Sequence, residues 1–178
     1  CSADLSYDCV ADDGKLTAGK PAQAIEDRIA QVTQEAYDNG DYIFVAMDRH
    51  DEGDTFHPET KLFPPHNIAG TSGRELYGKL AGVYDAIKDD SRVFWMDKRH
   101  YSAFSGTDLD IRLRERRVTT VVLTGVLTDI CVLHTAIDAY NLGYDIEVVA
   151  SATASLTPEA HDFAIGHFKN VLGATIVE

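Results

Sequence analysis

The sequence predicts a single α/β domain over residues 1–178: a three-layer sandwich in which a mainly parallel, six-stranded sheet is covered by helices on both faces. Apolar segments of strand length alternate along the chain with helical patterns of about ten or more residues, the order of βαβ units. These segments are apolar enough for strands that are buried on both faces. The 178 residues contain no repeat, linker or low-complexity segment, and they fit one domain with a sizeable core.

The N-terminal segment CSADLSYDCV (1–10) makes a poor buried strand, because only three residues precede Asp4. We therefore expect most of the first strand to lie upstream of Cys1.

The other elements follow from apolar periodicity and from helix start and stop residues. The predicted helix at 21–39 has apolar residues at helical spacing, Pro21 near its start and Gly40 after its end. Thr107 can cap a short helix around 109–113. In chain order we predict a helix at 21–39, a strand at 42–48, a loop at 49–73, a helix at 76–87, a strand at 93–97, a helix around 109–113, a strand at 118–126, a helix at 130–142, a strand at 145–155, a helix from 158 and a strand at 174–177.

Composition excludes several classes of partner. The net charge of −13 disfavours binding to nucleic acid or to an anionic membrane surface. No apolar run approaches the roughly 18–20 residues needed to span a membrane. The three cysteines are too few and too scattered for a disulfide framework, which favours a reducing cytoplasm.

Polar side chains follow three of the predicted strands. Asp48 ends one strand, Lys98 follows another, and Cys131 comes shortly after a third. Parallel strands bring their carboxyl ends to one edge of the sheet, where binding sites lie in such folds. A thiol needs a base or a positive field to become a thiolate, and a carboxylate and an ammonium group can supply both. A lone cysteine near a helix start is usually a packing residue, but this combination favours a nucleophile.

Three motifs resemble those of one enzyme family. GVLTDICV (125–132) is similar to the G-V-x-T-x-x-C-V signature of the isochorismatase-like cysteine hydrolases. The spacing of Asp4 and Asp8 resembles that family's N-terminal motif, and Lys98 with YSAFSGTDL (101–109) resembles its lysine segment. Within the family, the similarity to nicotinamidases, also called pyrazinamidases, runs through essentially the whole chain. The resemblance implies hydrolysis of nicotinamide and pyrazinamide through a cysteine thioester, in NAD salvage.

The same resemblance assigns the catalytic residues. It implies that Cys131 is the nucleophile, Asp4 its general base and later acid, and Lys98 the third member. It also implies a cis peptide bond between Val126 and Leu127. The backbone amides of Leu127 and Cys131 would then form the oxyanion hole.

Substrate contacts are implied in the same way. Phe63, Tyr101, Val126 and Leu127 would contact the substrate. The chain departs from the family at Cys9, where the N-terminal motif usually ends in a Phe that flanks the bound ring. This departure affects ring stacking and leaves the register of Asp4 unchanged.

The histidine-rich loop offers ligands for a metal ion. Asp48 and His50 are two residues apart, so they point to the same side of an extended strand end, and His57, Glu59 and His66 follow. Imidazoles and carboxylates suit zinc, manganese or iron(II), although a loop of this composition can simply be solvated. The resemblance implies one divalent metal ion on Asp48, His50 and His66, with Glu59 preferred to His57 as fourth ligand. Zinc is the expected ion, with manganese and iron as alternatives.

Other residues have structural interpretations: His134 packs or supports the site indirectly, His161 lies on the surface and Trp95 belongs to the core. Two alternative functions stay open. Another small-amide cysteine hydrolase of the same family would lack the metal. A non-catalytic binding protein of this fold would be expected to have lost Cys131, Asp4 or Lys98. We also expect a homo-oligomer, a dimer or a tetramer, with a small-molecule substrate.

Overall fold

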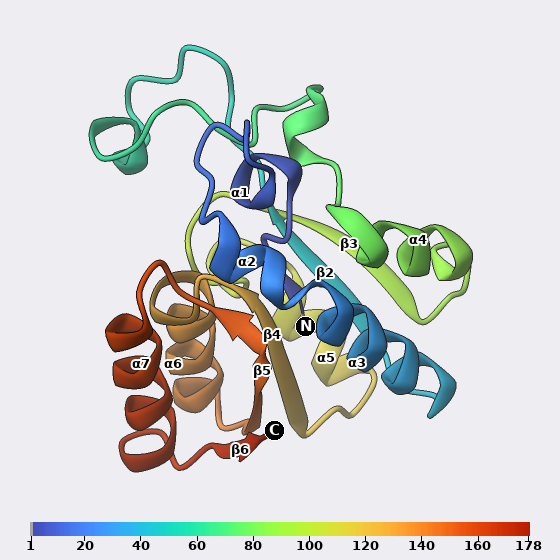
Figure 1. Ribbon diagram of the computed structural model, residues 1–178. Coiled ribbons are helices and arrows are strands. Elements are labelled where there is room, and N and C mark those ends of the chain that lie inside the picture. Colours follow the sequence, from blue (N-terminus) through green and yellow to red (C-terminus); the bar gives the residue numbers. More distant parts are fainter. Residues whose placement is uncertain (1) are drawn as a thin grey trace.

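A parallel six-stranded sheet runs through the middle of the computed structural model, which describes residues 2–178 (Figure 1). In spatial order its strands are β3-β2-β1-β4-β5-β6, and all neighbouring pairs are parallel. The strands are β1 (Ser2–Ala3), β2 (Ile43–Asp48), β3 (Val93–Lys98), β4 (Thr120–Val126), β5 (Asp145–Ala154) and β6 (Thr175–Val177). The predicted α/β class is confirmed.

Helices cover both faces of the sheet, as predicted (Figure 1). On one face, α5, α6 and α7 pack against side chains such as Phe44 of β2 and Leu123 of β4. On the other, α2, α3 and α4 pack against side chains such as Val45 and Val149. The helices are α1 (Tyr7–Val10), α2 (Lys20–Ala24), α3 (Glu26–Asp38), α4 (Gly78–Ile87), α5 (Leu109–Glu115), α6 (Leu133–Leu142) and α7 (Pro158–Asn170), with short 3₁₀ turns η1 (Pro58–Lys61) and η2 (Ser72–Arg74) and a π-helical turn η3 (Thr128–Val132). No helix among residues 2–178 has the length and apolar character that crossing a membrane requires.

Two predicted helices differ in detail from the structure. The helix predicted at 21–39 is divided into α2 and α3 at Ile25, which ends one helix and caps the next. The helix predicted from 130 begins as the π-helical turn η3 before it continues as α6. Its end is as predicted, because Gly143 adopts the left-handed conformation, with φ 82°, that favours glycine.

The prediction that Trp95 belongs to the core is wrong. It lies on β3, which forms an edge of the sheet, and it is 37% exposed. Its indole Nε1 donates a hydrogen bond to Asp97 Oδ1 at 2.9 Å, and its ring packs against Tyr84. The apolar residues 93–97 do not show that their strand lies at the edge of the sheet, where alternate side chains can face water.

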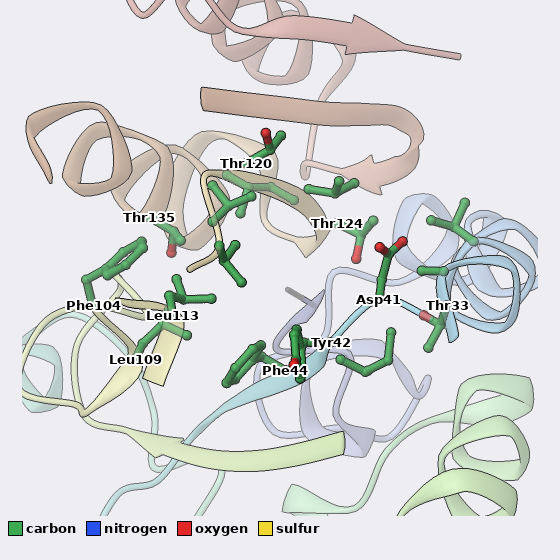
Figure 2. Close-up of a pocket in the computed structure, with 17 residues that line it drawn as sticks. Thr33, Asp41, Tyr42, Phe44, Phe104, Leu109, Leu113, Thr120, Thr124 and Thr135 are labelled. Carbon is green, nitrogen blue, oxygen red and sulfur yellow. The ribbon is translucent and has the colours of Figure 1, made fainter. Parts of the chain in front are cut away.

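A cavity of about 220 Å³ lies between β2 and β4, beside the short strand β1 (Figure 2). Ser2 pairs with Val45 and Thr124, and the residues that precede these partners in β2 and β4 line the cavity. In the part of the chain that the structure describes, its lining is mostly apolar and threonine side chains, with Asp41 the single acidic group. Among residues 2–178, this lining offers no catalytic combination of residues. The predicted extension of the first strand upstream of Cys1 lies outside the described residues.

Candidate active site

The carboxyl ends of four neighbouring strands bring the predicted catalytic residues together. Asp4 directly follows β1, Asp48 and Lys98 are the last residues of β2 and β3, and Cys131 lies in η3 after β4. Asp48 and Lys98 are register partners. Lys98, Asp4 and Cys131 are 0%, 2% and 7% exposed, so the group lies beneath the surface.

The Lys98 ammonium group lies between two carboxylates and a thiol. Its Nζ is 2.7 Å from Asp4 Oδ2 and also forms an ion pair with Asp48 Oδ1. It lies 3.7 Å from Cys131 Sγ and donates to the His100 carbonyl oxygen at 3.2 Å. A carboxylate oxygen from each aspartate and the Cys131 sulfur lie within 4.8 Å of one another. Acid, cation and thiol are therefore close enough for a proton to pass between them.

The backbone holds Asp4 in an unusual conformation. Its φ of 47° is left-handed, which is rare for a residue other than glycine and costs on the order of 1–3 kcal/mol. Its amide donates to the Ala46 carbonyl oxygen at 3.2 Å, and its Oδ1 accepts from the Asp48 amide at 2.8 Å. These bonds on both sides fix the direction of the carboxylate.

Burial and neighbouring charges shift the pKa values of Asp4, Lys98 and Cys131. Burial, with the nearby charge of Asp48, raises the pKa of Asp4 to about 6. Burial alone would lower the pKa of Lys98, but Asp4 and Asp48 together raise it well above its ordinary value. Burial raises the pKa of the Cys131 thiol well above its ordinary value, against the opposing effect of Lys98. At neutral pH the lysine is thus charged and the resting thiol is protonated, so the thiol needs a base.

Side chains from other elements hold the turn that carries Cys131. The peptide bond between Val126 and Leu127 is cis, as the family resemblance implies. Thr128 Oγ1 lies 2.9 Å from His161 Nδ1, on α7. His161 is half-buried, and the prediction of a surface residue did not include this contact with the turn.

His134 is exposed on α6, with its Nδ1 2.7 Å from the Ile130 carbonyl oxygen and its ring against Tyr101. It therefore contacts the backbone of the turn and one of the residues that line the cavity described below.

Thr135 connects the turn to the segment after β3. Its buried hydroxyl donates to the Cys131 carbonyl oxygen at 2.7 Å and accepts from the Ala103 amide at 3.0 Å. Thr135→Val keeps the shape and removes both of these hydrogen bonds. We expect it to lower the free energy of unfolding by about 1–3 kcal/mol, measured by urea denaturation. Thr135→Ser should keep most of the stability; equal stability of the valine variant and the parent protein would contradict this.

A second buried cluster adjoins the first. One ligand atom from each of Asp48, His50, Glu59 and His66 lies within 4.8 Å of the others, and all four residues are buried. Glu59 Oε2 lies 3.8 Å from His50 Nε2 and 3.7 Å from His66 Nε2. His66 Nδ1 lies 2.9 Å from the Pro64 carbonyl oxygen, an arrangement typical of metal-binding imidazoles.

The fourth member of this cluster is Glu59 rather than His57. The ring nitrogens of His57 have other partners: Nε2 lies 2.5 Å from the Arg99 carbonyl oxygen, and Nδ1 accepts from the Glu59 amide at 3.3 Å. His57 thereby positions the backbone of Glu59.

The chemistry of this cluster fits a divalent cation. Burial lowers the pKa of His50 to about 4, so its imidazole is neutral at physiological pH. Burial and the charge of Asp48 raise the pKa of Glu59 to about 7. His50 Nε2 is buried without a hydrogen-bond partner among the described residues. Buried polar atoms are rarely left unpaired, and a cation would satisfy this nitrogen and both carboxylates.

Both clusters open onto one cavity of about 120 Å³. All four predicted substrate contacts line it, and so does Cys9. Sequence reasoning did not assign five further lining residues: Leu16, Thr17, Ala18, Ile130 and Leu156. The first three belong to the segment ADDGKLTAG (11–19), and the similarity to nicotinamidases through essentially the whole chain was the signal that could have identified them.

Comparisons with known proteins agree with this geometry. A family model described as "Isochorismatase domain" matches residues 4–177. The chain is similar to the crystal structure of pyrazinamidase/nicotinamidase from Streptococcus mutans UA159, with 79% identity and a TM-score of 0.98 over 99% of this chain and 97% of that chain. An uncharacterized isochorismatase family protein PncA of Bacillus subtilis is 53% identical over 98% of this chain and 96% of its own length. Pyrazinamidase of Pyrococcus horikoshii in complex with zinc is 26% identical, with a TM-score of 0.86 over 99% of this chain and 96% of that chain.

Proposed function

Because the chain belongs to the isochorismatase domain family, we propose that it is a nicotinamidase, which hydrolyses nicotinamide and pyrazinamide and releases ammonia. The observation that carries the proposal is that the buried four-ligand cluster and the Cys131 thiol open onto the same cavity. A thiol with a base is sufficient for amide hydrolysis, whereas binding of a pyridine ring also requires a group that contacts the ring nitrogen. The similarity to structures described as nicotinamidase or pyrazinamidase supports this substrate.

Asp4 begins the reaction by taking the proton from Cys131. The thiolate attacks the carboxamide carbon, and the backbone amides of Leu127 and Cys131 stabilise the oxyanion. Asp4 returns its proton to the leaving nitrogen, ammonia departs and a thioester remains. Asp4 then removes a proton from a water molecule that attacks the thioester, and the acid product is released from Cys131.

Lys98 makes the first proton transfer feasible. Transfer from a thiol of raised pKa to Asp4, whose pKa is about 6, is uphill in the resting site. The ammonium group lies 2.7 Å from Asp4 Oδ2 and 3.7 Å from the sulfur, so it can stabilise the negative charge before and after the transfer. In a buried site this attraction is stronger than in water.

Asp48, His50, Glu59 and His66 would hold the divalent ion, for which zinc is the proposed metal and manganese or iron the alternatives. When bound, the ion would supply a Lewis acid that accepts the ring nitrogen and so orients the carboxamide toward Cys131. Phe63, Tyr101, Val126 and Leu127 would contact the ring and carboxamide, since all four line the cavity.

The proposed role is salvage of pyridine nucleotides in the cytoplasm. The low cysteine count and the net charge of −13 support a soluble protein of a reducing compartment. A homo-oligomer remains a prediction, which light scattering of the purified protein would check.

The decisive experiment measures ammonia release from nicotinamide, pyrazinamide and benzamide, with and without a chelator. We expect the chelator to weaken turnover of nicotinamide and pyrazinamide together, because both rings offer a nitrogen at a comparable position. Benzamide has no ring nitrogen and should be a poor substrate in either condition. A metal-free protein that hydrolysed benzamide as well as nicotinamide would instead be another amidase of the family.

Removal of a proposed ligand should remove the metal. We expect about one divalent ion per chain in the purified protein, and its loss in His50→Ala and in His66→Ala, measured by elemental analysis. His134→Ala is the matched control, because that histidine is exposed and outside the four-ligand cluster, and it should keep the ion. Full metal content in His50→Ala would show that the ligand set is wrong.

A further inference from the structure

Two of the proposed metal ligands, together with Phe63, form a wall between two cavities. Glu59 and His66 line the cavity that contains Cys131, and they also line a second cavity of about 430 Å³. We call this second space the loop cavity; its other lining residues come from segments 50–55, 60–65 and 68–71. His50 lines the loop cavity and is absent from the lining of the substrate cavity.

His50 provides the independent indication that a cation belongs at the inner end of the loop cavity. The residue is 7% exposed, and its Nε2 has no hydrogen-bond partner among the described residues. Asp4 and Cys131, by contrast, line only the substrate cavity. A cation can therefore meet His50, Glu59 and His66 from the loop side without passing the catalytic thiol.

The outer part of the loop cavity has excess negative charge. Asp51 and Asp54 pair with Arg99 at 2.6 and 2.8 Å, and Asp51 also lies 3.3 Å from Arg49. Glu52 is exposed and has no ion pair among the described residues. In the described part of the chain, the outer lining thus carries three carboxylates and no Lys or Arg, and of the two arginines that pair with it, Arg49 is shared with Asp97 at 3.6 Å. Such a balance attracts divalent cations and raises their rate of encounter, in a manner that salt weakens.

The substrate cavity has a different lining away from its catalytic residues and metal ligands. There, Leu16, Ala18, Ile130 and Leu156 present apolar side chains. An apolar approach suits an aromatic ring better than a hydrated cation, because removing a charged ion from water is costly.

We propose that the divalent ion reaches and leaves its ligands through the loop cavity, so that the ion and the substrate use separate entrances. The proposal rests on the proposed function, because it takes the four-ligand cluster as the metal site. It concerns the route of the ion and adds no step to the hydrolysis.

The test measures how fast metal-free protein binds cobalt(II), followed by the visible absorption of the bound ion after rapid mixing. Thr55→Trp narrows the loop cavity at an exposed position whose side chain has no hydrogen bond among those described. Leu156→Trp is the matched variant for the substrate cavity, since Leu156 is 59% exposed at its edge. We expect Thr55→Trp to slow cobalt binding by about fivefold or more and Leu156→Trp to leave the rate unchanged. Circular dichroism checks that both variants fold.

A second variant tests the charge without changing the shape. Glu52→Gln should lower the binding rate about two- to threefold at low salt, and the difference should disappear at high salt. Slower binding in Leu156→Trp alone, or equal rates in both tryptophan variants, would overturn the loop route while leaving the metal site intact. If the parent protein bound no cobalt, the metal site itself would be wrong, and that failure is distinguishable from failure of the route.

Discussion

Cys131→Ala should abolish ammonia release from nicotinamide and leave the fold and the bound metal intact. The substitution removes the sulfur that would form the thioester, and loss of a catalytic nucleophile lowers kcat by about 10⁴-fold or more. The residue is 7% exposed and loses one heavy atom, so the core around it changes little. Ammonia release measures the activity, circular dichroism the fold and elemental analysis the metal.

Cys9→Ala is the control, because Cys9 lines the same cavity. Its sulfur accepts a hydrogen bond from the side-chain nitrogen Nδ2 of Asn67 at 3.6 Å, and burial raises the pKa of the thiol to about 12. The Lys98 ammonium group, which contacts the Cys131 sulfur, has no hydrogen bond with Cys9 among those described. Cys9→Ala should therefore remain active. Appreciable turnover by Cys131→Ala would end the thioester mechanism.

Most of the proposed catalytic residues could be predicted from their positions at the carboxyl ends of predicted strands. The alternation of strands and helices indicates a parallel sheet, and a parallel sheet places Asp48, Lys98 and Cys131 at one edge without any knowledge of strand order. The role of Asp4 could be predicted only from the family resemblance, because β1 has two residues and is too short to be recognised as a strand from the sequence.

Contacts that depend on tertiary packing were not predictable. The pairing of Thr128 with His161 joins residues 33 positions apart, and helical periodicity alone does not identify it. The exposure of Trp95 depends on β3 being an edge strand, and strand order is a property of the whole fold. Asp48 belongs to both clusters, because it forms an ion pair with Lys98 and is also one of the four proposed metal ligands. Its position at the end of a strand does not predict the ion pair with Lys98.

Lys98→Met should lower both turnover and stability. The lysine is completely buried and forms ion pairs with Asp4 and Asp48, so its removal leaves two carboxylates facing each other without a cation. Breaking a buried ion pair by removing one partner typically costs about 3–5 kcal/mol. Turnover should fall by at least about 10²-fold, as for loss of acid–base catalysis, because the Cys131 thiolate loses its stabilising charge. Urea denaturation and ammonia release measure the two effects.

The double variant Asp4→Asn/Lys98→Met separates these effects. It removes one of the two unpaired carboxylates, so we expect it to be more stable than Lys98→Met alone, with coupling of about 0.5–3 kcal/mol as for residues in contact. It also lacks the proposed base, so activity should not return. Asp4→Asn alone should reduce turnover by at least about 10²-fold. Near-normal turnover in either single variant would show that the residue's proposed role is wrong. If the double variant were no more stable than Lys98→Met, the carboxylates of Asp4 and Asp48 would not repel each other in the absence of the lysine.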